Sequence, residues 1–256
     1  HGHQGVLMKS ARKDWVFLGV CWVLLTAIGL LMVWKLNLLP AGYSREAEIG
    51  DEAYKLLIAL GVPVFAGVAA SLLTILLRQV DKRTSDEVPT EDGPAITGHT
   101  TLVRSWVAIS ALLAIGLAID PGFTGLRDIR GETKADLVVD VQAQRWSWKF
   151  TYDGGEYSTT ELVLPIDERV RFDITSVDIV HSFWVPGFRQ KLDAVPGRIT
   201  KLYITPTELG DGNNDSTLRV QCAELCGTDH AKMTVPIRIV TQEEFDAWLA
   251  SIRKDG

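Results

Sequence analysis

The chain has 256 residues, a formal net charge of −6 at pH 7, and 46% hydrophobic residues. This length can bury the core of one large domain or two modest ones, and the acidic balance gives no sign of nucleic-acid binding. The composition is uneven: three long apolar runs lie between residues 15 and 119, whereas the sequence after Pro121 reads as a polar globular domain.

The apolar runs predict membrane-spanning helices. Residues 15–34 and 56–77 carry no charge, and about 20 such residues cross the hydrocarbon layer as a helix. The third run, 105–119, is short, but its flanking residues can extend it. We predict spans at about 15–37, 55–78 and 101–121, within a transmembrane region that ends near residue 130. The first run resembles a signal peptide, but it is long and no A-x-A-like site follows, so we expect a retained helix.

Basic residues set the predicted orientation, because they are enriched in cytoplasmic loops. They precede the first span and lie between the second and third, whereas the loop at 40–51 is mostly acidic. We therefore expect a multi-pass protein of the cell membrane with a cytoplasmic N-terminus and its C-terminal domain outside. The stretch 81–98 is an expected cytoplasmic connection. The basic residues are Lys9, Arg12, Lys13, Arg78, Lys82, Arg83 and Arg104.

Residues 131–256 predict a β domain. Apolar residues alternate in short runs separated by turn residues such as 153–155. The alternation changes parity between Val141 and Trp146, which predicts a bulge near Gln144. Several short strands with long connections favour a Greek-key sandwich or barrel. Thr241 and Glu244 have the spacing of a capping box and predict a C-terminal helix.

Four possible metal ligands lie close together in the sequence. Cys222, Cys226, His230 and Met233 fall within twelve residues, and His181 lies upstream, after a predicted strand. Thiols, imidazoles and a thioether are soft or borderline ligands that suit copper. The remaining cysteine, Cys21, is alone in an apolar run and is expected to pack there.

Each element has a simpler interpretation when it is considered alone. The two cysteines of the β domain could form a disulfide in an oxidising compartment. His181 and His230 could be ordinary polar residues, and Met233 could belong to the core. Zinc has no use for a thioether, and a single blue copper would leave one thiol spare. Two bridging thiolates with one histidine on each copper use every ligand present, so we favour a dinuclear copper site.

The motifs around these residues resemble those of subunit II of haem–copper cytochrome c oxidases. The resemblance covers roughly residues 54–245. The matching motifs are C-x-E-x-C-G-x-x-H-x-x-M at Cys222–Met233, D-x-x-H-S-x-x-V-P at Asp178–Pro186, and D-A-x-P-G-R at Asp193–Arg198.

The resemblance implies an α+β membrane protein in which transmembrane helices precede a cupredoxin-like domain with a dinuclear CuA centre. Cys222 and Cys226 would bridge the coppers, and His181 and His230 would bind one copper each. Met233 would be a weak ligand and the Glu224 carbonyl the last one. The Glu224 side chain would reach a magnesium or manganese ion shared with the catalytic subunit.

By the same resemblance, Trp146 would be the residue through which electrons enter from cytochrome c or a similar small redox protein. Without the resemblance, a Trp-x-Trp strand is more often core packing. The electrons would pass to haem in the catalytic subunit I, where O₂ is reduced to water and protons are moved. No C-x-x-C-H motif is present, so a covalent c-type haem is not expected in this chain.

The sequence departs from the family pattern in two places. There is an additional span before the usual two, for which packing against another subunit is the simplest role. The family's usual glutamate at the mouth of a proton path is replaced by Val103, next to Arg104. His1 and His3 are compatible with a tag, and Met8 with a natural start.

Two other functions remain open at the level of sequence. One is the CuA domain of a nitrous oxide reductase, although that enzyme carries a large propeller and has no need of these spans. The other is a non-enzymatic copper-binding or copper-delivery module. A quinol oxidase subunit would share the fold but would lack the copper ligands.

Overall fold

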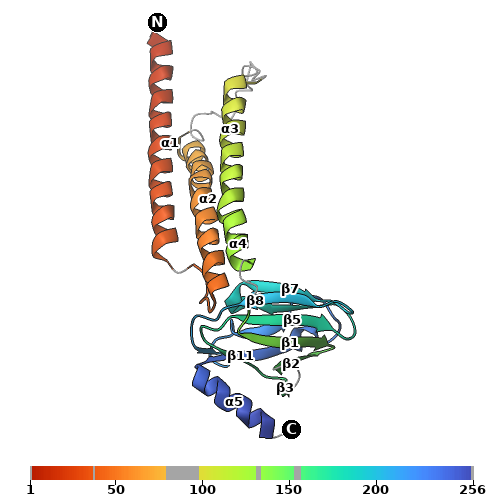
Figure 1. The fold of residues 1–256 in the computed structure, drawn as a ribbon. Coiled ribbons are helices and arrows are strands. Elements are labelled where there is room, and N and C mark those ends of the chain that lie inside the picture. Colours follow the sequence, from red (N-terminus) through yellow and green to blue (C-terminus); the bar gives the residue numbers. More distant parts are fainter. Residues whose placement is uncertain (1, 37, 79–97, 131–133, 153–156, 255–256) are drawn as a thin grey trace. The chain divides into compact units, whose positions relative to one another are not determined.

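The structure is a computed structural model that describes residues 2–36, 38–78, 98–130, 134–152 and 157–254 (Figure 1). Its contacts divide the chain into two compact units. The first comprises residues 1–38 and 53–118, and the second comprises residues 39–52 and 119–256. The turn expected at 153–155 and, except for Gly98, the connection expected at 81–98 lie outside the described residues.

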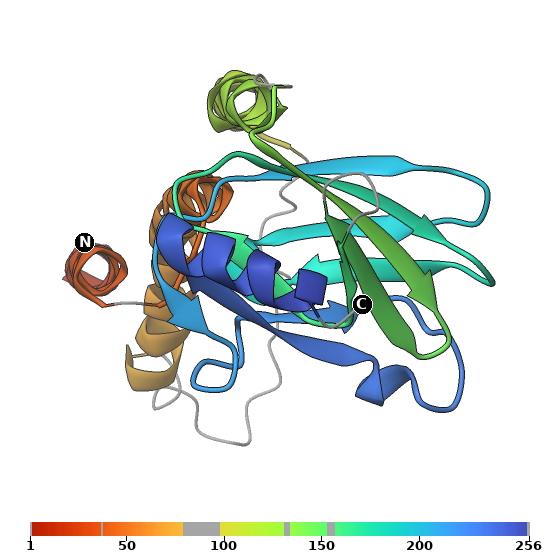
Figure 2. The same ribbon diagram turned by 60° about the horizontal axis from the view of Figure 1, so that its bottom comes forward.

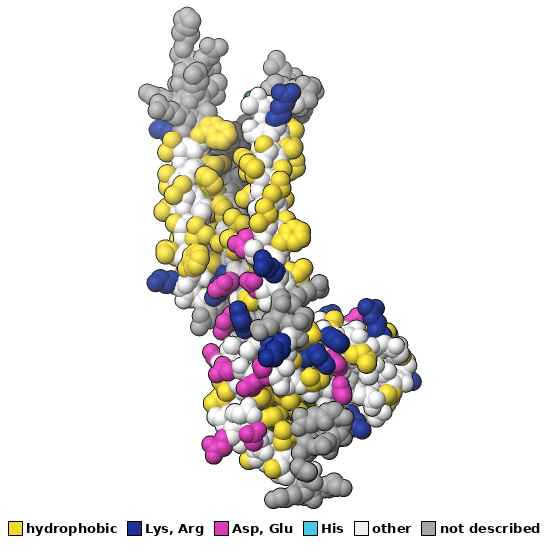
Figure 3. Space-filling model, in the orientation of Figure 1, with side chains coloured by type: hydrophobic (Ala, Val, Ile, Leu, Met, Phe, Trp, Pro, Cys, Tyr) yellow, Lys and Arg dark blue, Asp and Glu magenta, His cyan; other side chains and the backbone are white. Residues whose placement is uncertain are grey.

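The first unit is helical and apolar on its surface. Trp15, Phe65 and Leu112 are 72%, 78% and 71% exposed, and hydrophobic side chains cover the helices in Figure 3. Such a surface suits lipid or the helices of other subunits, because water would not solvate it. The three predicted apolar helices are thus confirmed in the described residues. They are α1 (Gly2–Lys35), α2 (Arg45–Arg78) and α3 (Thr100–Leu117).

The additional N-terminal helix packs closely against α2. A Cβ atom at Gly29 would lie 2.6 Å from the Cγ1 atom of Val62, so the two helices approach at a point where a larger residue would not fit. Nearby, the indole N–H of Trp22 donates to the carbonyl of Pro63 at 2.8 Å. Small residues and a polar contact are the usual means by which helices associate in a membrane.

The third predicted span is extended in the way its flanking residues suggested. After α3 the chain continues through a π-type turn, Ala118–Phe123, into α4 (Thr124–Arg130). Asp120 leaves the helical conformation, with φ −137° and ψ 118°, because the following Pro121 disfavours a helical residue before it. The kink divides one apolar stretch into two helices.

The second unit is a β-sandwich. One sheet has the strand order β3-β2-β1-β5-β8, and the other has the order β4-β11-β10-β6-β7 with β9 paired to β11. The predicted fold class, membrane helices followed by a cupredoxin-like sandwich, is confirmed. The strands are β1 (Leu137–Gln144), β2 (Ser147–Tyr152), β3 (Tyr157–Thr159), β4 (Leu162–Pro165), β5 (Val170–Ser176), β6 (His181–Val185), β7 (Gln190–Ala194), β8 (Thr200–Ile204), β9 (Gly210–Asp211), β10 (Arg219–Cys222) and β11 (Thr234–Val240).

The predicted alternation places the core as expected, but the predicted bulge near Gln144 is wrong. Val170, Phe172 and Ile174 are fully buried on one face of β5. Between β1 and β2 the chain instead forms a hairpin, in which Gln144 pairs with Ser147. The reversal of the chain at this two-residue turn, and not an inserted residue, changes the parity of the buried positions.

The predicted C-terminal helix is present as α5 (Gln242–Lys254), and it lies against the β unit in Figure 2. Its capping box forms, because the backbone N–H of Thr241 donates to the Glu244 carboxylate at 3.0 Å and the Glu244 N–H donates to the Thr241 hydroxyl at 3.3 Å. The ring of Trp248 meets that of Tyr152 edge to face at 5.2 Å. The helix therefore closes one end of the core.

The segment that joins α1 to α2 folds as part of the β unit. Residues 39–52, which we call the connecting segment, were expected to be only a loop. Instead Ser44 caps the start of α2 by accepting from the Ala47 N–H at 3.1 Å. The Tyr43 N–H donates to the Gly187 carbonyl at 2.9 Å, and the Tyr43 carbonyl accepts from the Thr207 N–H at 3.1 Å.

Two ion pairs hold the connecting segment in place. Glu46, which is 1% exposed, accepts from the Arg169 guanidinium at 2.5 Å and from the Thr205 N–H at 3.0 Å. Asp51 accepts two hydrogen bonds from Arg189, at 2.8 and 3.1 Å. A buried carboxylate of this kind must keep its partner, because an unpaired charge in the interior is strongly destabilising.

We expect Glu46→Ala to lower the free energy of unfolding of the β unit by about 3–5 kcal/mol, because Arg169 and the Thr205 N–H would lose their buried acceptor. The control is Glu48→Ala, which removes an exposed carboxylate from the same segment and should change stability by less than about 0.5 kcal/mol. Denaturant titration of the full chain in detergent, followed by near-ultraviolet circular dichroism, measures both. Equal stability of the two variants would contradict the importance of the ion pair.

Candidate metal centre

The two cysteines and His181 meet because two neighbouring strands end at the same place. His181 is the first residue of β6 and Cys222 the last residue of β10, and these strands are antiparallel with Cys222 opposite Phe183. The loop that follows β10 carries Cys226 and His230 before the chain enters β11 after Met233. Strand pairing therefore fixes one part of the site, and a short loop closes over it.

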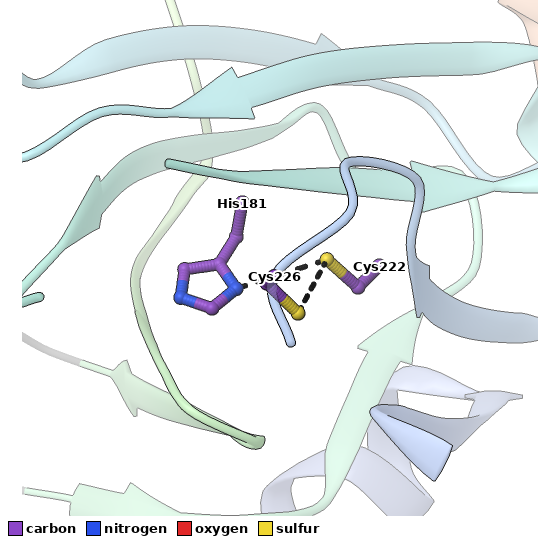
Figure 4. A group of neighbouring side chains, drawn as sticks. All are labelled: His181, Cys222 and Cys226. Carbon is purple, nitrogen blue, oxygen red and sulfur yellow. Dashed lines mark hydrogen bonds between the residues drawn. The ribbon is translucent and has the colours of Figure 1, made fainter. Parts of the chain in front are cut away.

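The sulfur atoms of Cys222 and Cys226 lie 3.7 Å apart and both cysteines are free. A disulfide would require about 2.05 Å. The Nδ1 atom of His181 lies 3.7 Å from the Cys222 sulfur, and the three ligand atoms fall within 4.8 Å of one another. Figure 4 shows the imidazole nitrogen and the two sulfurs pointing toward one another.

The remaining predicted ligands surround the same pair of sulfurs. The Nδ1 atom of His230 lies 3.5 Å from the Cys226 sulfur, and the Met233 sulfur lies 3.9 Å from the same atom. The Glu224 carbonyl oxygen lies 3.2 Å from the Cys222 sulfur. Each histidine thus faces a different cysteine, and the six predicted residues come together at one point.

The centre is nearly closed to solvent. His181 and Met233 are fully buried, and the two cysteines are 5% and 2% exposed. Burial, together with the hydrogen bond to Cys222, raises the pKa of the Cys226 thiol to about 11. The thiol therefore keeps its proton at neutral pH unless a metal cation replaces it.

The donor atoms fit copper better than the alternatives. Thiolate, imidazole and thioether together match the preferences of copper, and zinc would leave the thioether unused. The carboxylate of Glu224 is exposed, and among the described residues the one cluster of histidine, cysteine and carboxylate ligands is that of His181 with the two cysteines. A second cation at Glu224 therefore stays a prediction.

Two residues that were given no separate role in the sequence support the ligands. Asp178 accepts a hydrogen bond from Nε2 of His181 at 2.9 Å. Burial opposes ionisation of Asp178, but hydrogen bonds from His181, Arg145 and Ile179 hold the pKa of this carboxyl well below its usual range. Trp148 packs edge to face on the His181 ring and donates its indole N–H to the Met233 carbonyl at 3.3 Å. The D-x-x-H motif, in which Asp178 lies three residues before His181, was the feature of the sequence that could have predicted this contact.

Trp146 lies at the surface beside the ligand loop. It occupies the turn between β1 and β2 and is 38% exposed, in contrast to the buried Trp148. A Cβ atom at Gly227 would lie 3.2 Å from the Trp146 ring, and Gly227 has φ +123°. Two features therefore require a glycine after Cys226. One is the backbone conformation, which other residues rarely adopt, and the other is the Trp146 indole, which leaves little space for a side chain.

Comparisons with known proteins agree on one family. The model of the family "Cytochrome C oxidase subunit II, periplasmic domain" matches residues 156–240, which include all six predicted ligands. The cytochrome c oxidase subunit 2 of Thermostichus vulcanus is 27% identical over 279 residues, which cover 88% of this chain and 82% of that protein.

Other similar proteins match shorter stretches. The probable cytochrome c oxidase subunit 2 of Rickettsia conorii is 32% identical over 63% of this chain, which spans 56% of that protein's length. The crystal structure of the periplasmic domain of subunit II of cytochrome oxidase from Bradyrhizobium japonicum is 31% identical, with a TM-score of 0.44, and the match covers 48% of this chain and 96% of that domain.

Proposed function

Because the chain belongs to the cytochrome c oxidase subunit II family, we propose that it is the electron-accepting subunit of a haem–copper terminal oxidase. It takes electrons from cytochrome c or a similar small redox protein at a dinuclear copper centre. It passes them to haem in the catalytic subunit, where O₂ is reduced to water and protons are translocated. The chain itself works as one subunit of this oxidoreductase complex.

The observation that carries the proposal is the pair of free cysteine sulfurs, 3.7 Å apart, with one histidine facing each. When bound, a dinuclear copper centre would gain one electron from a reduced donor and release it to an acceptor, with the charge shared over both metals and sulfurs. Cys222, Cys226, His181 and His230 would hold the coppers, and Met233 and the Glu224 carbonyl would complete the set.

The protein itself contributes by fixing the positions of these ligands and by limiting their contact with water. An electron carrier reacts fast when its bonds change little between oxidation states, and a rigid β-framework limits such changes. Strand pairing fixes His181 and Cys222, and Trp148 packs on the imidazole while it binds the Met233 carbonyl. Burial of His181, Met233 and the two cysteines limits the access of water to them, and the surroundings of a metal site in this way influence its redox potential.

The centre itself is tested by electron paramagnetic resonance of the full chain loaded with copper in detergent. We expect a hyperfine pattern of two equivalent copper nuclei that share one unpaired electron, because both sulfurs contact the same metal pair. Cys226→Ser should abolish this pattern, and the exposed neighbour Thr228→Ala should retain it. A pattern from a single nucleus in the parent chain would contradict the dinuclear centre.

The assignment to an oxidase is tested in the complex purified from its native membrane. Haem in the complex and oxygen uptake with reduced cytochrome c support the proposal, whereas copper without haem or oxygen uptake would indicate a copper-binding module. Metal analysis of the same complex tests the second cation, since Glu224→Gln should lower bound magnesium or manganese and leave copper unchanged.

We propose Trp146 as the residue through which electrons enter, because its half-exposed indole lies against Gly227, next to the ligand Cys226. Trp146→Phe should slow the reduction of the copper centre by reduced cytochrome c steeply, with copper content and spectrum unchanged. The control is Gln142→Ala, an exposed neutral residue of the same hairpin. Stopped-flow reduction measures both, and equal rates would remove Trp146 from the route.

The proposed orientation puts the β unit on the outer side of the cell membrane and the N-terminus in the cytoplasm. Basic residues before the first span and between the second and third support it, because such residues are enriched in cytoplasmic loops. Protease added to right-side-out spheroplasts should remove an epitope tag attached after residue 256 and spare one attached before residue 1. The opposite pattern would reverse the assignment.

A further inference from the structure

One carboxylate contacts both the proposed copper site and the turn that carries Trp146. Asp178 lies between β5 and β6, three residues before the ligand His181. Its Oδ1 atom accepts from Nε2 of His181 at 2.9 Å and from the Ile179 N–H at 2.7 Å. Its Oδ2 atom accepts from the backbone N–H and the Nε of Arg145, at 2.9 and 3.1 Å.

The contact through Oδ1 decides which nitrogen of His181 is free to bind a metal. An imidazole that donates its Nε2–H to a carboxylate keeps the lone pair on Nδ1. In His181 that atom is the one that lies 3.7 Å from the Cys222 sulfur. The ring has no room to turn over, because it is fully buried and packed against Trp148.

The contact through Oδ2 fixes the turn between β1 and β2. Arg145 directly precedes Trp146, and the carboxylate holds it by both its backbone and its guanidinium. The Trp146 indole then lies over Gly227, next to Cys226. The two carboxylate oxygens therefore contact a metal ligand and the residue before the exposed tryptophan, which belong to strands or turns of different sheets.

We propose that Asp178 is a positioning residue that holds His181 with Nδ1 toward the sulfurs and, through Arg145, holds Trp146 against the ligand loop. The inference rests on the proposed function, since it assigns the residue that ties the copper centre to the group that receives electrons. Asp178 acts through the residues it holds, His181 and Arg145.

The two sets of contacts, which we call the arm to His181 (through Oδ1) and the arm to Arg145 (through Oδ2), can be separated by substitution. Asp178→Ala removes both arms. In Asp178→Asn the amide oxygen should face the donors of His181 and Ile179, because the His181 ring is fully buried whereas the Arg145 side chain is 49% exposed and can bond to water instead. The amide NH₂ group would then face Arg145. The asparagine variant therefore loses the arm to Arg145 and keeps the arm to His181.

The matched control is Asp173→Asn on β5. This carboxylate also pairs with an arginine, Arg171, at 2.8 and 3.1 Å. Its loss removes the same charge from the same unit, so it reproduces any general effect of charge on docking of a basic donor.

The experiment uses the full chain with copper bound and measures copper release to a chelator, the electron paramagnetic resonance spectrum and the rate of reduction by reduced cytochrome c. Asp178→Ala should bind copper about 10- to 100-fold more weakly, with an altered spectrum, as is usual when a group that orients a metal ligand is lost. Asp178→Asn should keep copper and its spectrum but accept electrons more slowly than Asp173→Asn does.

The inference is overturned if Asp178→Ala matches Asp173→Asn in copper release and spectrum. If the alanine variant does not fold, the asparagine variant decides, and a reduction rate equal to that of Asp173→Asn overturns the link to Trp146. A parent chain without a dinuclear copper spectrum would instead overturn the proposed function, so the two failures are distinguishable.

Discussion

The site depends on the antiparallel pairing of β6 with β10. This pairing brings His181, at the start of one strand, beside Cys222, at the end of another that lies 41 residues further along the chain. The other donors follow within one short loop, so they need no further long-range contact. If the register slipped by one residue, His181 would turn to the opposite face of the sheet, and the sulfurs would lose their partner.

Local patterns were sufficient to predict most of the architecture. Hydropathy identified three apolar helices, period-2 alternation identified the buried faces of strands such as β5, and the Thr241–Glu244 spacing identified α5. The ligand cluster was equally visible, because five of its six residues lie in one motif and the sixth, His181, lies at one end of a strand. The five residues of the motif are close in space because they are close in the sequence, whereas His181 joins them only through strand pairing.

Features that depend on distant contacts were not visible in the sequence. A change of parity at Gln144 fits either a bulge or a hairpin, and only the pairing of Gln144 with Ser147 distinguishes them. The connecting segment looked like an acidic loop, because the arginine that pairs with Glu46 lies 123 residues away. Asp178 stood in a motif, but its contact with Arg145 joins residues 33 positions apart. A contact of this kind does not appear in the hydropathy pattern of the sequence.

The Glu46–Arg169 pair has a consequence for how the molecule is held together. It closes a loop of chain that contains nearly all of α2 and the whole of α3. Both of its residues belong to the second unit, so the two ends of this loop are held together by a buried ion pair. A single break of the backbone inside that loop would leave two fragments that remain associated. Separation of the two fragments would require breaking the Glu46–Arg169 ion pair, so the cleaved protein would behave as a complex of two chains.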